Sequence, residues 1–475
     1  MASEENLTFE FGDARLDQRG RSVMRKLLDK NIVNIRKMAE NWAEQIGFYR
    51  FFDNQKVTSE RLSQSFAQHC GQRASGGHYL VIQDTTQPNF EWNRRQISDQ
   101  NGLGVIGDGA SLGFFLHPSL VLRASDESCI GFAHVHHWAR TGVRPKDERA
   151  AQVYKSQAIE DKESYRWLQS MERAGEVLKD ADQITNIQDR EGDIFELFHQ
   201  TQQQERAHLI VRSRDNRNIL TSEGKKAKLF EYMSKAPVLG VYSLPVRGDI
   251  RKKRVKRVAH IEVRVQKVWV LPPKRLARTH RAVCLWAVEA CESPQTVPAG
   301  EKPILWRLIT SHVADTLEEA VEIIYFYSLR WHIETLFRLL KTDGLNIEAC
   351  ELESGYAIIR MTYLCLFAAL RCMCLLLAAK HEDNQQAAND LFEPDEIQCL
   401  EKIGHELNGK TTKQSNPYKA HSLQWAFWII GRLGGWSGLA SQHPPGVITL
   451  HNGLKRFNDL YDGWRIAHKK DVYIP

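Results

Sequence analysis

The sequence predicts an α/β fold with helical domains on either side, and three observations lead to this fold class. Short segments rich in β-branched and aromatic residues follow one another from His78 onward. Segments of helical period alternate with the later ones and also occupy both ends of the chain. The 475-residue chain is 42% hydrophobic and 26% charged, which is ordinary for a globular protein with several cores.

Residues 1–65 predict a small helical bundle. Helical period is found over residues 13–31, 35–54 and 57–70, with turn-like breaks between them. We expect one face of the bundle to be basic, and an ordinary solvated helix is the alternative. The cations concentrated in the first helix are Arg15, Arg19, Arg21, Arg25 and Lys26.

The central residues 66–380 are predicted to form a catalytic α/β domain, with its strands and helices in the sequence order of a ribonuclease H-like sheet. A helix is expected at residues 161–179, before the fourth strand, and another at residues 194–204, after it. Three consecutive strands, then helix, strand, helix and strand is the order of a ribonuclease H-like sheet. The five strands are expected at residues 78–86, 112–124, 129–140, 183–193 and 208–215.

A β-rich insertion is expected within this core at about residues 215–300. Residues 228–246, 258–273 and 281–292 alternate like strands of an antiparallel sheet. The α/β pattern resumes with a helix that begins at Leu317. A loop in the insertion concentrates six cations, for which solvation alone is the alternative to contact with an anionic partner. These cations are Arg251, Lys252, Lys253, Arg254, Lys256 and Arg257.

The stretch YSLRWHIETLFRLLK, residues 327–341, predicts an amphipathic helix. Its apolar residues fall on one arc. With about 3.6 residues per turn, its polar residues Tyr327, Arg330, Glu334 and Lys341 share a second arc about 60° wide. A tyrosine, two cations and one acid in a line are unusual for a face that only solvates the helix.

Residues 362–379 are nearly long enough to span a bilayer, but Arg371 lies near their middle. We expect a buried core helix, in which Arg371 needs a buried partner. After a polar linker, residues 381–475 predict a C-terminal helical domain. The nine cysteines form no CxxC pair, and the N-terminus has no signal-peptide pattern. These features favour a cytoplasmic protein with no membrane partner.

Three acids stand where an active site of sheet and helix would place them. Asp84 and Asp189 end predicted strands, whose carboxyl ends meet at one crevice in open α/β sheets. Glu334 is on the polar arc of the helix. Such carboxylates suit Mg²⁺ or Mn²⁺. Two such metal ions about 4 Å apart can stabilise the attacking and leaving oxygens of a phosphodiester displacement. Structural alternatives are a turn, a helix N-terminus, and an ion pair of Glu334 with Arg330 or Arg338.

At these residues the sequence resembles the DDE transposases of the insertion-sequence-four family. QDTT contains Asp84, QDREGDI contains Asp189, and the spacing of Tyr327, Arg330, Glu334 and Lys341 matches the family's YREK pattern. YRFFDN, LIVRSRD, LWRLITS and LQWAFWIIGRLGG also resemble that family, so the resemblance extends over nearly the whole chain. The N-terminal region matches more loosely.

The resemblance implies a cut-and-paste DNA transposase. Asp84, Asp189 and Glu334 then correspond to the catalytic residues, which bind two Mg²⁺ ions, with Mn²⁺ as a substitute. Double-stranded DNA, both transposon ends and target, is the implied partner, and a homodimer holds two ends. The N-terminal domain would bind the transposon end and the C-terminal domain would dimerise. The enzyme would act in the bacterial cytoplasm, associated with the nucleoid.

The resemblance also implies a set of DNA-binding residues. Trp306 corresponds to the residue on which a flipped base stacks, and Arg212 to a position near the DNA end. A related nuclease without strand transfer and an inactive DNA-binding inhibitor are the two alternative functions, and the presence of all three acids argues against the second. The expected DNA contacts are Tyr327, Arg330, Lys341, Trp306, Arg212, Lys252, Lys253 and Arg254.

Overall fold

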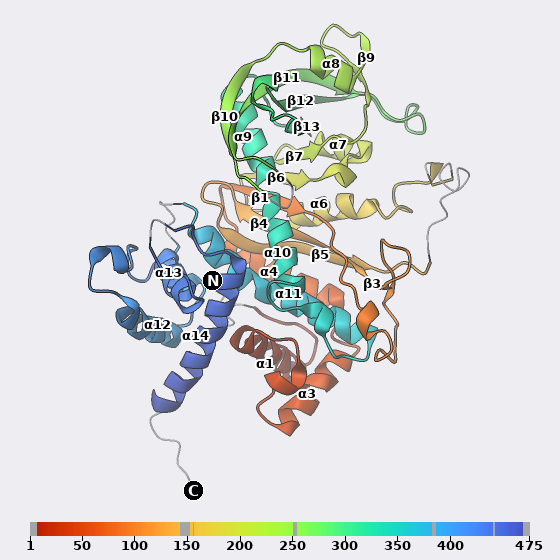
Figure 1. Ribbon diagram of the computed structural model, residues 1–475. Helices are drawn as coiled ribbons and strands as arrows, with labels where there is room; N and C mark the ends of the chain where they lie inside the picture. Colours follow the sequence, from red (N-terminus) through yellow and green to blue (C-terminus); the bar gives the residue numbers. More distant parts are fainter. Residues whose placement is uncertain are drawn as a thin grey trace.

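The computed structural model describes residues 7–142, 153–154, 156–249, 254–381, 386–439 and 442–468. One large mixed sheet runs through the centre of the molecule (Figure 1). Its first half has the strand order β5-β4-β1-β6-β7, antiparallel from β5 to β1 and parallel from β1 to β7. These strands are β1 (His78–Gln83), β4 (Phe115–Arg123), β5 (Cys129–Trp138), β6 (Gln183–Gln188) and β7 (Ala207–Arg212).

This half confirms the predicted mixed α/β fold, and its strand order is compatible with a ribonuclease H-like sheet. The central strands are buried on both sides because helices cover both faces. Some of their buried side chains are polar, and Gln83 bonds to both Asn186 and Gln188. In β1, Leu80 and Ile82 belong to the core under the long helix α11 (Gly355–Ala378). Tyr79 and Val81 belong to the core under α6 (Tyr165–Val177). A short helix, α7 (Phe195–Thr201), precedes β7.

The expected insertion continues the same sheet. β13 (Leu305–Thr310) pairs with β7, and β12 (Val283–Glu292), β11 (Arg257–Val270) and β10 (Gly240–Val246) follow outward. β8 (Asn218–Leu220) and β9 (Lys226–Lys228) complete that edge, at the top of Figure 1. A two-stranded ribbon, β2 (Gly104–Val105) with β3 (Leu112–Gly113), stands apart.

One strand prediction in the insertion was wrong at its start. The first part of the segment 228–246 forms a helix, α8 (Leu229–Lys235). Leu229 and Met233, four residues apart, are its buried residues, and this spacing is helical. The strand β10 that follows does show alternating burial. The prediction therefore treated the seven-residue helix and this strand as one strand.

The N-terminal region is helical as predicted, with one helix divided. The expected helix at residues 35–54 is broken into α2 (Ile35–Met38) and α3 (Trp42–Asp53), because Asn41 caps α3 by accepting from the Glu44 backbone N–H. The other helices are α1 (Ala14–Lys30) and α4 (Ser59–Arg73). α4 passes through position 65 and packs on β5, so the boundary predicted there falls inside a helix.

The polar stretch at residues 327–341 is divided between two helices. α9 (Leu317–Ser328) ends before it is complete, and α10 (Trp331–Lys341) begins after Arg330. At the junction, the backbone N–H groups of Arg330 and Ile333 donate to carbonyls three residues back, which tightens the turn. Tyr327 therefore lies in the last turn of one helix, while Glu334 and Lys341 belong to the next.

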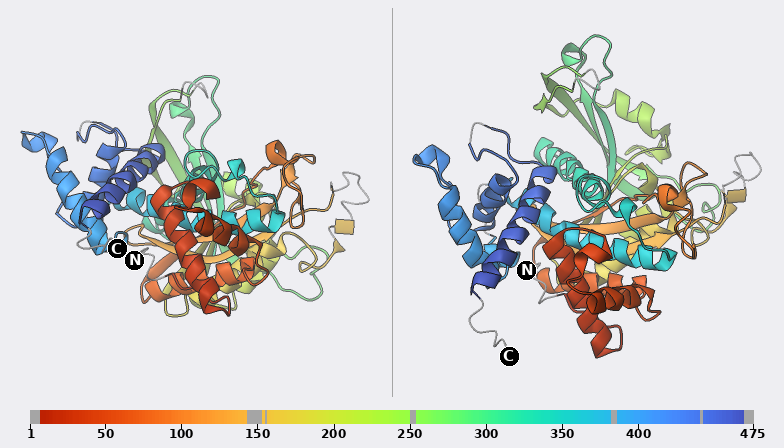
Figure 2. Two further views of the ribbon diagram at one scale, coloured as in Figure 1. Left: turned by 90° about the horizontal axis from the view of Figure 1, so that it is seen from below. Right: turned by 60° about the horizontal axis from the view of Figure 1, so that its bottom comes forward.

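The apolar helix α11 is the core of the molecule's helical side. It is long and apolar enough to cross a membrane, but 94% of that window is buried inside the protein. N-terminal α1 and C-terminal α13 (Leu423–Leu433) and α14 (Val447–His468) all pack against it (Figure 2). Arg371 finds its partner on α12 (Pro394–Leu407), where Glu396 accepts from Nη2 at 2.6 Å.

The buried pair of Arg371 and Glu396 generates a stability prediction. Only 6% and 8% of these side chains is exposed, so Glu396→Ala leaves a guanidinium in the core with its main counter-charge removed. We expect a loss of about 3 kcal/mol in the free energy of unfolding, measured by urea denaturation. Restoring an apolar pair with Arg371→Met and Glu396→Leu should recover most of it.

The control for this prediction is an exposed ion pair. Arg173 and Glu176 on α6 are more than half exposed. Arg173→Ala should therefore change the free energy of unfolding by less than about 1 kcal/mol. A Glu396→Ala variant as stable as Arg173→Ala contradicts the assignment of Glu396 as the buried partner.

Candidate active site at the carboxyl edge of the sheet

The two strand-end aspartates lie side by side. β1 and β6 pair in parallel, with Ile82 opposite Ile187. Asp84 and Asp189 each follow two residues later, so the same register places them opposite one another on adjacent strands about 4.8 Å apart. Ile82 and Ile187 both belong to the core under α9–α11, and side chains two residues further on share that side of the sheet.

Each aspartate is held by a backbone amide of its own loop. Thr85 N–H donates to Asp84 Oδ1 at 2.8 Å, and Glu191 N–H donates to Asp189 Oδ1 at 2.8 Å. Asp189 thus caps a short helical turn, as one structural alternative anticipated, and still stands beside Asp84. The capping contact orients the carboxylate.

Glu334 approaches the aspartates from α10 through a shared arginine. Arg330, at the α9–α10 junction, donates to Asp84 Oδ2 at 2.6 Å and to Glu334 Oε1 at 2.7 Å. The predicted alternative of an ion pair four residues apart is therefore present, and the same guanidinium joins Glu334 to the strand end. Asp84 and Glu334 lie on opposite sides of one positive charge.

Burial raises the pKa of Asp84 to about 7, and the neighbouring Asp189 carboxylate contributes to the rise. Arg330 opposes this rise, and Glu334 adds to it. Two carboxylates that face one another at a partly enclosed edge repel when both are charged. An additional cation at this edge would relieve that repulsion.

The donor set fits a divalent cation in its chemistry. Three carboxylates offer hard oxygen ligands, and Arg330 shares its single positive charge between two of them. Among the residues that the structure describes, no three His, Cys, Asp or Glu side chains converge closely enough to enclose a metal ion. Arg330 lies between Asp84 and Glu334 instead.

Tyr327 and Trp306 are brought together near Asp189. The Tyr327 side chain is buried, and its ring meets Trp306 edge to face, with centroids 5.3 Å apart. Burial raises the pKa of Tyr327, while the nearby charges of Arg330 and Arg212 lower it. Arg212, at the end of β7, also reaches the Leu305 carbonyl at 3.4 Å. Tyr327 is thus part of an interior wall rather than an exposed helical face.

Lys341 is turned toward the loop that follows Asp84. Its Nζ donates to the Gln87 carbonyl at 2.9 Å and lies 3.3 Å from Glu348 Oε1. Lys341 thereby holds the loop that begins at Asp84 and reaches Gln87.

The basic loop of the insertion is only partly described. Lys252 and Lys253 lie outside the described residues. Arg254 is exposed and donates to the Arg247 carbonyl at 2.9 Å. The expectation that Arg257 contributes to this exposed charge was wrong, because it pairs with Glu292 and Glu301, each at 2.7 Å, and only 10% of its side chain is exposed.

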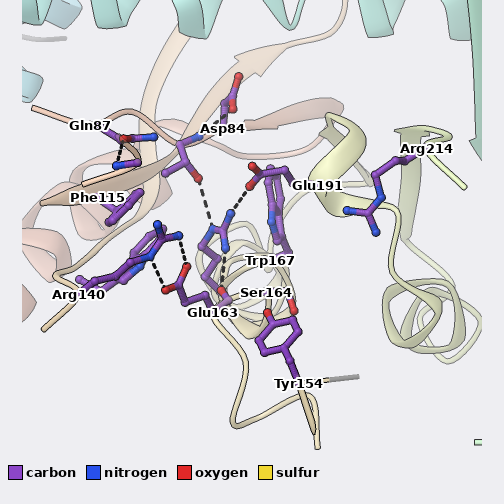
Figure 3. Close-up of a pocket in the computed structure, with 14 residues that line it drawn as sticks. Asp84, Gln87, Phe115, Arg140, Tyr154, Glu163, Ser164, Trp167, Glu191 and Arg214 are labelled. Atoms are coloured by element: carbon purple, nitrogen blue, oxygen red, sulfur yellow. Dashed lines mark hydrogen bonds and ion pairs between the residues drawn. The ribbon is translucent and has the colours of Figure 1, made fainter. Parts of the chain in front are cut away.

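A cavity of about 430 Å³ adjoins Asp84 at the sheet edge (Figure 3). Phe115, Trp167 and Glu191 line it, and Arg140 is paired with Glu163 on its wall. Sequence reasoning did not single out these residues. Glu191 could have been noticed as a neighbour of Asp189, whereas residues of other elements gave no local signal.

A sheet of this order, with three acids gathered at its carboxyl edge beside arginine, lysine and aromatic side chains, is the arrangement of an enzyme that acts on phosphodiesters. Family comparison sharpens that class. Residues 1–57 match the family model described as Transposase DNA-binding, and residues 195–371 match the Transposase DDE domain. The matches support a DNA transposase of the DDE type, a class that uses divalent metal ions.

The matched regions cover the predicted site unequally. Glu334 and Trp306 lie within residues 195–371, whereas Asp84 and Asp189 precede them. The proximity of these aspartates to Glu334 therefore comes from the geometry alone.

The pKa of Asp84 generates a prediction on stability and pH. A folded-state pKa near 7, above the ordinary 3.8, means that stability is lost as pH rises from about 4 to about 7. Without divalent metal, Asp84→Asn should therefore exceed the wild type in free energy of unfolding by about 4 kcal/mol at pH 8 and by little at pH 4. Urea denaturation in chelator at several pH values measures this difference.

The matched control is Asp180→Asn, at an exposed position. Its free energy of unfolding should differ from that of the wild type by less than about 1 kcal/mol at both pH values, because surface substitutions have small effects. An equal difference for Asp84→Asn at pH 4 and pH 8 contradicts the raised pKa.

Proposed function

We propose that the protein is a cut-and-paste DNA transposase of the insertion-sequence-four type. It binds the inverted-repeat ends of a transposon, cleaves them through a DNA hairpin and joins their 3′ ends to target DNA. The observation that supports this most directly is that Asp84 and Asp189 end adjacent strands at one sheet edge, and that Glu334 is joined to Asp84 there through Arg330. The two transposase family matches supply the class.

The acids and Arg330 would have different roles at the scissile phosphate: the acids bind metal ions and Arg330 supplies positive charge. Mg²⁺, or Mn²⁺ in its place, held as two ions by Asp84, Asp189 and Glu334, would supply an activated water and stabilise the leaving oxygen. Thr85 and Glu191 backbone amides keep the two aspartates oriented. Arg330 neutralises the acids in the free protein and has a guanidinium fork that suits a phosphate when DNA is present.

The aromatic pair beside the acids would receive a base extruded from the transposon end. Forming a hairpin requires sharp distortion of the duplex, and stacking on an aromatic ring compensates for the base stacking that is lost. Trp306 is half-buried against Tyr327, with Arg212 close by, so stacking and phosphate neutralisation are available at one place.

The N-terminal helices would hold the transposon end. α1 exposes four arginines, and residues 1–57 match the DNA-binding family model. A sequence-independent share of this affinity should depend on salt. The exposed arginines of α1 are Arg15, Arg19, Arg21 and Arg25.

We also propose that two copies assemble on two DNA ends, with the C-terminal helices as the contact surface. α14 exposes apolar side chains, including Leu460 and Ile466, that a partner would cover. The enzyme would work in the bacterial cytoplasm on nucleoid DNA.

Replacing the acids tests the catalytic assignment. Asp84→Ala, Asp189→Ala and Glu334→Ala should each lower cleavage of transposon-end DNA by at least about a thousandfold, because several kcal/mol of charge stabilisation are lost. Binding of the end, measured by gel shift, should change by less than about twofold. DNA that carries the short inverted repeats expected to flank the gene would provide the substrate.

Two controls make this test specific. Glu322→Ala removes an exposed acid of α9 and should cleave like the wild type. Wild-type protein given a pre-cleaved end and a supercoiled plasmid should yield joined product. Cleavage without joining identifies a nuclease, and retained cleavage in one of the three variants removes that residue from the catalytic set.

Replacing Trp306 tests the aromatic pocket. Trp306→Ala should slow hairpin formation by about ten- to a hundredfold, since stacking of a base on an aromatic ring contributes about 1–3 kcal/mol. Nicking of the first strand, which precedes extrusion, should be affected less. Fluorescence of 2-aminopurine placed near the cut reports the extruded base.

The matched variant is Trp286→Ala on the neighbouring strand β12, a partly buried tryptophan that packs against the same core. It should leave the ratio of hairpin to nicked product unchanged. If both tryptophan variants lower that ratio equally, Trp306 has no specific role in base stacking.

A further inference from the structure

Arg166 stands behind the catalytic edge, on the face of the sheet opposite to α10. It lies in the first turn of α6, and only 8% of its side chain is exposed. Its guanidinium lies over the Trp138 ring, 4.8 Å from the centroid, on the wall of the cavity in Figure 3. Nη1 donates to the Glu163 carbonyl at 2.8 Å, which fixes the plane of the group.

The remaining donors of this guanidinium reach both aspartate loops. Nε donates to Thr85 Oγ1 at 3.3 Å, and Nη2 is ion-paired with Glu191. Thr85 Oγ1 is also 2.9 Å from His117 Nδ1, a fully buried ring. The fork of one buried arginine therefore bridges two loops that leave adjacent strands.

The two residues bound by Arg166 are those whose backbone amides hold the catalytic acids. Thr85 N–H donates to Asp84 and Glu191 N–H donates to Asp189, each at 2.8 Å. Each path runs from the guanidinium through a side chain to its own backbone N–H and then to a carboxylate. Arg166 is therefore linked to both aspartates by the same type of contact sequence.

We propose that Arg166 is a positioning residue that sets the separation and orientation of Asp84 and Asp189. It rests on the proposed function, because the two carboxylates matter as a pair only if they bind the catalytic metal ions. Arg166 does not touch the DNA or the metal in this assignment. It acts through Thr85 and Glu191, in the manner of outer residues that orient metal ligands.

The geometry requires arginine rather than another cation. The planar guanidinium presents donors in several fixed directions, whereas an ammonium is a single point of charge. Here the separate nitrogens serve Thr85, Glu191 and the Glu163 carbonyl. Arg166→Lys should therefore keep the charge and lose the bridge.

The experiment measures Mn²⁺ binding by the full chain without DNA. Thermal unfolding is followed over a Mn²⁺ titration, since a ligand of the folded state raises the melting temperature according to its affinity. We expect Arg166→Met to raise the apparent dissociation constant for Mn²⁺ by about tenfold or more, and Arg166→Lys to raise it by a similar amount. The Mn²⁺ concentration for half-maximal DNA cleavage should rise in parallel, with end binding unchanged.

Arg140→Met is the matched control. Arg140 lines the same cavity, lies over the Phe115 ring at 4.2 Å and makes two 2.7 Å bonds to Glu163. Among the contacts of the described residues it bonds to neither aspartate loop. Its loss should lower stability about as much as that of Arg166 and leave the Mn²⁺ affinity within about twofold of wild type.

Two milder variants test each path separately and serve if Arg166→Met does not fold. Thr85→Val removes the hydroxyl, and Glu191→Gln removes the charge. Each should weaken Mn²⁺ binding by severalfold in the wild-type background and have little further effect in Arg166→Lys, because the path is already broken.

Three outcomes are decisive. Mn²⁺ binding that is weakened in the Arg166, Thr85 and Glu191 variants and unchanged in Arg140→Met supports the inference. Equal weakening in Arg140→Met, or unchanged Mn²⁺ affinity in Arg166→Met, Thr85→Val and Glu191→Gln, overturns it while wild-type cleavage stands. A wild type that neither binds Mn²⁺ nor cleaves DNA overturns the proposed function itself.

Discussion

Parallel pairing of β1 with β6 is the constraint on which the candidate site depends. The ladder fixes Ile82 opposite Ile187, and both strands end at the same level. A shift of one residue would turn one aspartate to the other face of the sheet and bury a polar side chain in a core. The apolar residues of both strands are packed under helices on each face, so the register cannot slip without losing that burial.

The second part of the site depends on the break between α9 and α10. Glu127, buried in the β4–β5 turn, accepts from the Tyr325 hydroxyl on α9 and is 3.1 Å from His332 Nε2 on α10. These contacts flank the junction that contains Arg330. A hairpin at the far end of β1 and β6 thereby helps to fix the angle at which α10 brings Glu334 toward Asp84.

Much of this architecture could be predicted from sequence, because burial on alternate faces and helical period are local patterns. The strands ending at Asp84 and Asp189 and the helix with Glu334 were expected. The junction at Arg330 was not, since its residues have helical dihedrals and only their hydrogen bonds differ. α8 was lost because seven residues are too few to show their period beside a strand.

The composition of the site was less predictable than its acids. Asp193 lies in the same DREGD run as Asp189, yet it is fully buried and paired with Arg217 at 2.6 Å. Spacing alone does not distinguish the two. Arg166 and Glu396 gave no signal, because a buried ion pair is formed by tertiary contact and each half resembles an ordinary charged residue of a helix. The roles of the DNA-contacting residues remain predictions.

The continuous sheet fixes the distance between two parts of the candidate site. Trp306 on β13 and Asp84 beyond β1 are separated by three strand intervals, through β6 and β7. Because neighbouring strands are held about 4.8 Å apart, the part of this offset that runs across the strands is about 14 Å and is set by hydrogen-bond ladders rather than by loops. Loops between these strands can therefore change in length without altering the spacing. The sheet itself therefore sets the spacing between the acids and the tryptophan.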